Sequence, residues 1–162
     1  MKKTAQLSLL LTIFSILLSL TAFSQDMDNR KMSRILSKEV EAVEGQLGNW
    51  QAVYGNRVIY IITDQNANRM RIMTPVVELK EVKKKEFETL LEANFDRALD
   101  AKYCIFEEYV MTVYTHPLKE LTEEQFIDAM RQVVTLAYNY GSTYTSTNMV
   151  FGGGAEEEEK DK

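Results

Sequence analysis

The 162-residue sequence contains one histidine and one cysteine, which removes most catalytic and metal-binding templates. His116 and the distant Cys104 do not provide the three or four convergent ligands that a zinc site needs. A Ser-His-Asp triad would have to use His116, yet no Gly-x-Ser-x-Gly turn accompanies it. Gly152–Gly154 runs into acidic residues, which would repel phosphate. We therefore expect no enzyme: no catalytic residues, no metal and no cofactor.

Clustered positive charge is also scarce: acidic residues outnumber basic ones by 24 to 19, the net charge is −5, and the candidate basic run is Lys83–Lys85. On a helix this run is typical of a solvated face. An acidic surface repels phosphate backbones, so nucleic acid is not an expected partner. Cys104 has no second cysteine for an intramolecular disulfide. Its apolar surroundings favour a buried thiol, and an intermolecular disulfide or a reactive thiol is the alternative.

The first 24 residues have the pattern of a signal peptide. Two lysines precede an apolar run from Leu7 to Leu20, and small residues occupy the −3 and −1 positions of a cleavage site before Gln25. The run is shorter than the roughly 20 residues that span a membrane, so an uncleaved anchor is the weaker alternative. No cysteine follows the site to accept a lipid. We predict a bacterial periplasmic or secreted protein without a stable membrane anchor after cleavage.

The remaining sequence predicts a single α+β domain over residues 31–151. A polar lead-in at 25–30 precedes it, and a Gly-rich and then acidic tail at 152–162, expected to be disordered, follows it. Hydrophobic periodicity predicts an antiparallel sheet of about five strands with three helices, in the order α-β-β-β-α-β-β-α. The helices are expected at 32–45, 82–99 and 122–141, and the strands at 50–54, 58–62, 69–74, 102–106 and 109–115.

Local signals define several boundaries of these elements. Thr122 and Gln125 have the spacing of a capping box, and Leu121 can pack on Phe126 as a hydrophobic staple. Gly55-Asn56 favours a type II′ hairpin turn, and Pro75 should limit the third strand.

Two acidic segments imitate functional motifs. Asp64–Asn68 resembles the opening of an EF-hand loop, but Arg69 stands where the glycine should be and Pro75 where the bidentate glutamate should be. A hairpin turn is the better interpretation. Glu107 and Glu108 are adjacent on an extended chain and so point to opposite sides, which does not suit a pair of catalytic carboxylates.

The strands are apolar on both faces, whereas a half-solvated antiparallel sheet should alternate apolar and polar residues. Either the three helices divide between the two faces, or a second subunit or a protein partner covers one of them. Methionine and tyrosine suit an adaptable contact surface. The candidate partner-binding residues are Tyr60, Met73, Tyr109, Met111 and Tyr114.

The second half of the sequence contains a set of packing and capping motifs, at 101–105, 116–118, 121–126, 132–137, 140–144 and 151–154. Together they resemble YbjN-type domains, whose fold is similar to that of type III secretion chaperones. The resemblance runs from Val82 to Gly154, and back to Met32 by pattern only. It implies a small α+β domain that binds proteins, often as a dimer, without catalysis. Related members are described as sensory or regulatory. An export signal departs from the pattern of secretion chaperones, which act in the cytoplasm.

The leading functional hypothesis is an exported, non-enzymatic module that binds a protein partner, or itself, through the apolar sheet. A small-molecule binder or uncharacterised enzyme is the alternative, with a pocket between sheet and helix and with His116 and residues 143–145 as its polar groups. A self-associating envelope protein is the third.

Overall fold

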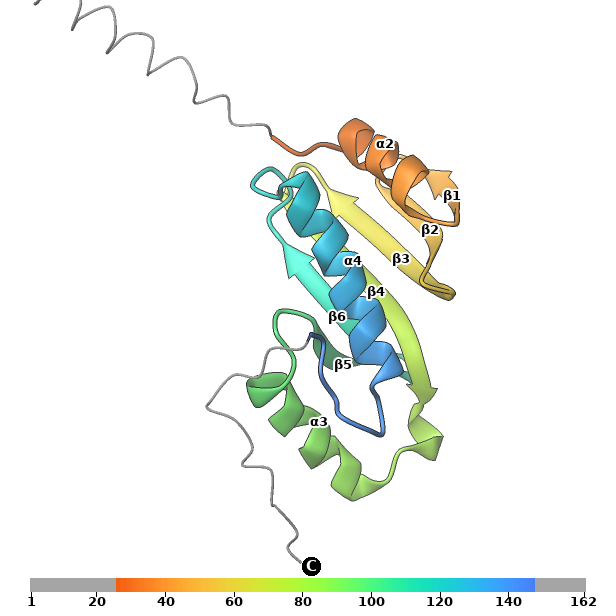
Figure 1. Cartoon of the computed structure of the whole chain (residues 1–162), viewed down its shortest axis with the longest axis vertical. Coiled ribbons are helices and arrows are strands. Elements are labelled where there is room, and N and C mark those ends of the chain that lie inside the picture. The colour runs from red at the N-terminus through yellow and green to blue at the C-terminus, as the bar shows by residue number, and fades with distance from the viewer. Residues whose placement is uncertain (1–25, 148–162) are drawn as a thin grey trace, which may run out of the picture.

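The computed structural model describes residues 26–147, which form an antiparallel sheet with three helices on one side of it (Figure 1). The predicted signal peptide and the acidic tail lie outside the described residues. No helix within residues 26–147 is long and apolar enough to cross a membrane. The helices are α2 (Asn29–Glu39), α3 (Lys84–Asp96) and α4 (Glu123–Tyr138). The strands are β1 (Ala42–Gln46), β2 (Asn49–Tyr54), β3 (Arg57–Asp64), β4 (Arg69–Glu78), β5 (Lys102–Phe106) and β6 (Tyr109–His116), and a short 3-10 helix spans Leu79–Glu81.

The six strands lie in the order β1-β2-β3-β4-β6-β5, and every neighbouring pair is antiparallel. The first four strands form a meander. The chain then passes through α3 to the far edge, forms β5 and returns as β6 beside β4. The sheet therefore has two edge strands, β1 and β5.

Helix α4 packs across the middle of the sheet, over β3, β4 and β6 (Figure 1). Its start confirms the predicted capping box: Thr122 Oγ1 accepts from Gln125 N–H at 3.1 Å, and the Gln125 side chain accepts from Thr122 N–H at 2.9 Å. Leu121 and Phe126, the predicted staple pair, are both fully buried. Helix α2 contacts α4 and β1, and α3 contacts β5.

The prediction that the first helix continues to Gly45 is wrong. Helix α2 ends at Glu39, and Ala42–Gln46 forms the additional strand β1, so the sheet has six strands rather than about five. All five residues of β1 are exposed, which leaves no alternation of buried and exposed positions to reveal a strand. Pairing with β2 establishes this strand, and Gly45 lies opposite Trp50 with a φ of +112°.

The predictions for the end of the third expected strand and for the Gly55-Asn56 turn also need correction. Strand β4 continues through Pro75 to Glu78, with a bulge between Pro75 and Val77. Its pairing with β3 ends at Tyr60–Met73, so Pro75 lies where β4 is paired on one side only, and a proline is tolerated there. The Gly55-Asn56 turn has φ of +58° at both residues, which is type I′ rather than type II′.

Helix α3 is shorter than predicted and buries a smaller part of its apolar surface. Helical spacing predicts one apolar stripe of Phe87, Leu90, Leu91, Phe95 and Ala98. Leu90 and Ala98 are buried, whereas Leu91 and Phe95 are 70% and 85% exposed. Ala93 instead faces the core. Two large apolar side chains on α3 therefore have no cover within the described residues.

Candidate functional site

All three helices pack against the same face of the sheet. The buried residues of α2, α3 and α4 belong to one core cluster, which also contains Ile59, Ile61, Ile72 and Tyr114 of the sheet. The interpretation in which the helices divide between both faces is therefore wrong. No helix within residues 26–147 covers the opposite face, since each one directs its buried side chains to the first face.

We call the face without helices the open face, and the strand register gives its composition. Residues directly opposite each other in an antiparallel pair lie on the same side of the sheet. Tyr60 faces Met73, Met73 faces Val113, and Met111 lies between Pro75 and Cys104. The large apolar residues of the open face are Val53, Val58, Tyr60, Ile62, Met73, Pro75, Cys104, Phe106, Tyr109, Met111 and Val113.

The open face exposes several large apolar side chains. Ile62 and Tyr109 are 41% and 40% exposed, and Val58 and Phe106 are also exposed. Most of the remaining apolar residues are half-buried by their neighbours in the sheet, and Met111 is buried. Contiguous apolar surface of this kind marks interaction sites on soluble proteins.

Four of the five predicted partner-binding residues lie together on the open face: Tyr60, Met73, Tyr109 and Met111. Tyr114 lies opposite Ile72 on the helix-covered face and is 8% exposed, so it belongs to the core. Its position one residue out of phase with Met111 and Val113 already indicates the opposite face. Phe106 and Ile62, which the prediction omitted, are more exposed than the residues it included.

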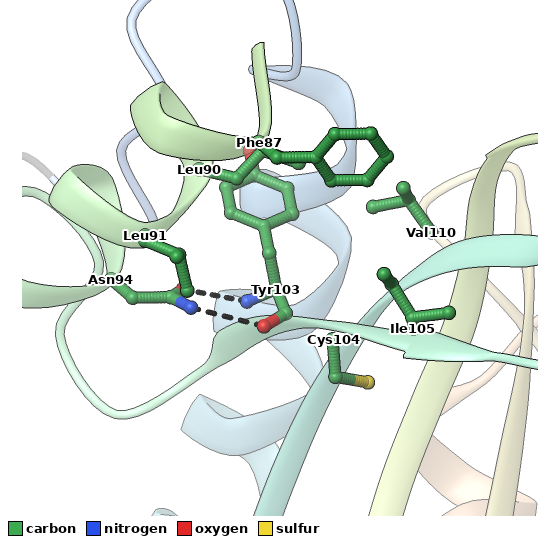
Figure 2. Close-up of a pocket in the computed structure, with 8 residues that line it drawn as sticks. All are labelled: Phe87, Leu90, Leu91, Asn94, Tyr103, Cys104, Ile105 and Val110. Atoms are coloured by element: carbon green, nitrogen blue, oxygen red, sulfur yellow. Dashed lines mark hydrogen bonds between the residues drawn. The ribbon is translucent and has the colours of Figure 1, made fainter. Parts of the chain in front are cut away.

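A second feature is an apolar groove of about 360 Å³ between α3 and β5, which we call the α3–β5 groove (Figure 2). It is lined from α3 by Phe87, Leu90, Leu91 and Asn94, and from the sheet by Tyr103, Cys104, Ile105 and Val110. Leu91 and Ile105 are largely exposed. The groove thus lies beside the outer edge of β5, an edge strand of the sheet.

Asn94 binds the backbone of edge strand β5 as a neighbouring strand would. Its Nδ2 donates to Tyr103 O at 3.0 Å, and its Oδ1 accepts from Tyr103 N–H at 2.7 Å (Figure 2). Alternation along an antiparallel strand directs the N–H and C=O of Ile105 to the same outer edge. Lys102 also ties β5 to the C-terminal end of α3, because its Nζ donates to the carbonyl groups of Asn94, Ala98 and Leu99.

We expect Asn94→Ala to lower the free energy of unfolding by about 1–2 kcal/mol, because it leaves two half-buried backbone groups of Tyr103 without partners. Hydrogen exchange of the Tyr103 amide should accelerate by the same free energy if the edge opens locally. Urea denaturation and exchange mass spectrometry measure the two quantities. Asn66→Ala, in the exposed β3–β4 turn, is the matched control and should change stability by less than about 0.5 kcal/mol. Equal losses in both variants would contradict the role of Asn94.

Tyr103 joins the groove to the C-terminal part of the described chain. Its hydroxyl donates to Leu136 O at 2.7 Å, and its ring makes edge contacts with Tyr140 and Tyr144 at centroid distances of 6.2 and 6.1 Å. Burial raises the pKa of the Tyr103 hydroxyl, with smaller contributions from the two neighbouring tyrosines. The residue therefore stays neutral at physiological pH and acts as a packing and hydrogen-bonding group.

The polar residues predicted for a small-molecule pocket do not line the groove. His116 lies at the end of β6, where its Nδ1 is 2.7 Å from Pro117 O and its ring stacks on Tyr114. Thr143 and Thr145 contact each other instead. The polar side chain of the groove, Asn94, is occupied by the backbone of Tyr103. Small-molecule sites combine apolar walls with free polar groups that orient the ligand.

Cys104 is half-buried in the structure. Burial raises the pKa of its thiol, and the positive charge of Arg71 offsets only part of this effect. A thiol with a raised pKa has little thiolate at neutral pH and is a weak nucleophile. Within residues 26–147 no group of three or more His, Cys, Asp or Glu side chains converges as metal ligands do.

Comparison with known proteins identifies the class of fold. A chain of the solved HopA1-SchA chaperone-effector complex superposes with a TM-score of 0.50 at 11% sequence identity, over 67% of this chain and 95% of that chain. The sequence matches no model of a known protein family and no curated protein. The described residues thus have the α+β fold of a chain from a chaperone-effector complex, which supports the chaperone-like fold expected from the resemblance.

Proposed function

We propose that this protein is an exported, non-enzymatic domain that binds another polypeptide through the open face of its sheet, in a chaperone-like or regulatory role. The observation that carries this proposal is the placement of all three helices on one face, with an apolar surface left on the other. The structural neighbour comes from a chaperone bound to an effector, which supports a protein rather than a small molecule as the ligand.

The chemistry of the open face suits an apolar polypeptide segment. Tyrosine and methionine are enriched in protein interfaces, and an amphipathic helix laid across the strands would fill the surface between Ile62 and Phe106. A second copy of the chain, as expected from the YbjN-type resemblance, presents the same chemistry. From the predicted signal peptide we propose that either partner is met in the periplasm or outside the cell, unlike the partners of chaperones that serve a secretion machine in the cytoplasm.

The test is crosslinking of the tagged protein in its native host, followed by mass spectrometry, with wild type and two variants in parallel. Ile62→Lys combined with Tyr109→Lys places two charges on exposed positions of the open face. We expect capture of the partner to fall by about tenfold or more, equivalent to about 1.4 kcal/mol. Leu47→Lys, which changes a 55% exposed side chain in the β1–β2 turn, is the matched control and should retain capture.

Circular dichroism and the urea midpoint of both variants establish that the fold is retained. Sedimentation velocity distinguishes a second copy from a different partner, because a homodimer would dissociate in the Ile62→Lys, Tyr109→Lys variant without any other protein present. Undiminished capture by the folded double variant would overturn the assignment of the open face.

A further inference from the structure

The described chain ends beside the α3–β5 groove. Ser146 is buried, and its Oγ accepts from Leu99 N–H at 2.7 Å in the loop that joins α3 to β5. Asn139 Nδ2 donates to the carbonyl of Thr145 at 2.8 Å, which holds the same segment on the end of α4. The residues that follow Thr147 therefore leave the domain near the C-terminal end of α3, and this end of α3 adjoins the groove.

The sequence that follows has the composition of a ligand for this groove. Three apolar residues, Met149, Val150 and Phe151, come within four positions of the last described residue. The groove offers Leu91 and Ile105 as exposed apolar walls, and the outer edge of β5 offers the N–H and C=O of Ile105. An extended segment can pair with such an edge and place alternate side chains in the adjoining groove.

Charge complementarity gives the direction in which the segment would run. Lys83, Lys84 and Lys85 are exposed at the N-terminal end of α3, and Lys83 occupies the N-cap position without a side-chain cap. The positive end of a helix dipole favours negative charge; Glu86 supplies one in the first turn, and the three lysines leave an excess of positive charge there. Glu156–Glu159 supplies four negative charges from the same chain.

The length of the chain permits this arrangement. Helix α3 has 13 residues and is about 20 Å long. The chain from Thr147 to Glu156 spans about 30 Å when extended. Gly152–Gly154 and Ala155 separate the apolar and acidic parts, so no bulky side chain lies between them. A segment that starts at the C-terminal end of α3 can therefore reach the lysines at its N-terminal end.

We propose that residues 148–151 occupy the α3–β5 groove and that Glu156–Glu159 contacts Lys83–Lys85. The C-terminal segment then covers the apolar edge of the sheet from within the same chain. A covalently linked segment has a high effective concentration, so modest contacts suffice to hold it there. This inference concerns the β5 edge and is independent of what binds the open face.

Cysteine pairing tests the apolar contact directly in the full mature chain. In a Cys104→Ser background, Leu91→Cys is combined with Val150→Cys, and oxidised glutathione is added as the oxidant. We expect a disulfide within one chain, formed several-fold faster than in the control pair Leu47→Cys with Val150→Cys. The Leu47 side chain is similarly accessible, at 55% exposed, but it lies in the β1–β2 turn at the opposite edge of the sheet.

Equal rates in the two pairs would overturn the proposal. A disulfide formed only between two chains would also overturn it and would assign the groove to a second copy. Crosslinking should slow as salt is raised, because the contact between Glu156–Glu159 and the lysines is exposed and screened. Charge reversal of Lys83, Lys84 and Lys85 to glutamate should slow it several-fold at low salt. A rate unaffected by both would remove the acidic half of the proposal.

Truncation provides a second measurement that needs no cysteine. A chain that ends at Thr147 should show faster hydrogen exchange at Ile105 and stronger binding of an apolar fluorescent dye than the full chain. A chain that ends at Gly154 retains residues 148–151 and should behave much more like the full chain. Identical exchange at Ile105 in all three would contradict occupancy of the groove.

Discussion

Phe126→Ala is expected to lower the free energy of unfolding by about 3–5 kcal/mol, the usual cost of removing a fully buried aromatic ring. Phe126 is 0% exposed in the first full turn of α4, and it packs within the same core cluster as Leu121 and Ile72. Domains of this size have roughly 5–15 kcal/mol of stability in total. The substitution should therefore remove at least about a fifth of it, measured as a shift in the urea midpoint at unchanged slope.

Phe95→Ala is the matched control for this variant, since it makes the same chemical change at an 85% exposed position on α3. We expect a change of less than about 0.5 kcal/mol. A large loss at Phe95 would mean that another part of the protein covers α3 in solution. A small loss at Phe126 would contradict the position of α4 over the sheet.

Gly45→Ala is expected to destabilise the protein by about 3 kcal/mol and to release the β1–β2 hairpin. The φ of +112° is one that residues with a side chain rarely adopt, and an added Cβ would overlap the backbone carbonyl of Asn49. Backbone atoms of a paired strand cannot move aside as a flexible side chain would. Because β1 is an edge strand, local detachment limits the total cost. Hydrogen exchange across β1 and β2, together with urea denaturation, measures the effect.

Gly141→Ala separates backbone conformation from steric overlap. Gly141 also has a positive φ, of +74°, yet an added Cβ would meet nothing within 4 Å. We expect a loss of about 1 kcal/mol, from conformation alone. If the two variants were equally stable, the close approach of Gly45 to Asn49 would not exist in solution.

The elements that the sequence predicts well are those whose signals are local. The start of α4 follows from Thr122 and Gln125, because each group of a capping box bonds within four residues of its partner. Strand β1 has no such signal. Its residues are all exposed, and its conformation depends on β2, so hydrophobic periodicity extended the preceding helix through Val43 to Gly45. The prediction that Pro75 limits the strand failed for the same reason. A proline is tolerated in β4 there because the pairing with β3 has already ended.

The candidate site shows a similar division. Alternation along β3, β4 and β6, together with their register, places Tyr60, Met73 and Met111 on one face. Sequence could not indicate which face the helices cover, because the direction in which a chain crosses a sheet is a property of the whole fold. The contact of Asn94 with Tyr103 could not be predicted either, because a single half-buried asparagine on a helix has no sequence pattern that indicates its partner.

The position of α4 at the end of the described chain has a consequence for synthesis, which proceeds from the N-terminus. The meander of β1 to β4 is complete long before residues 123–138 emerge, and its core side chains, Ile59, Ile61 and Ile72 among them, have no helix over them until then. Strand β5 must wait as well, because β6 separates it from β4. Stable structure therefore forms late, after nearly all of residues 26–147 has left the ribosome. The nascent domain therefore depends on α4, the last helix within the described residues, to complete its core.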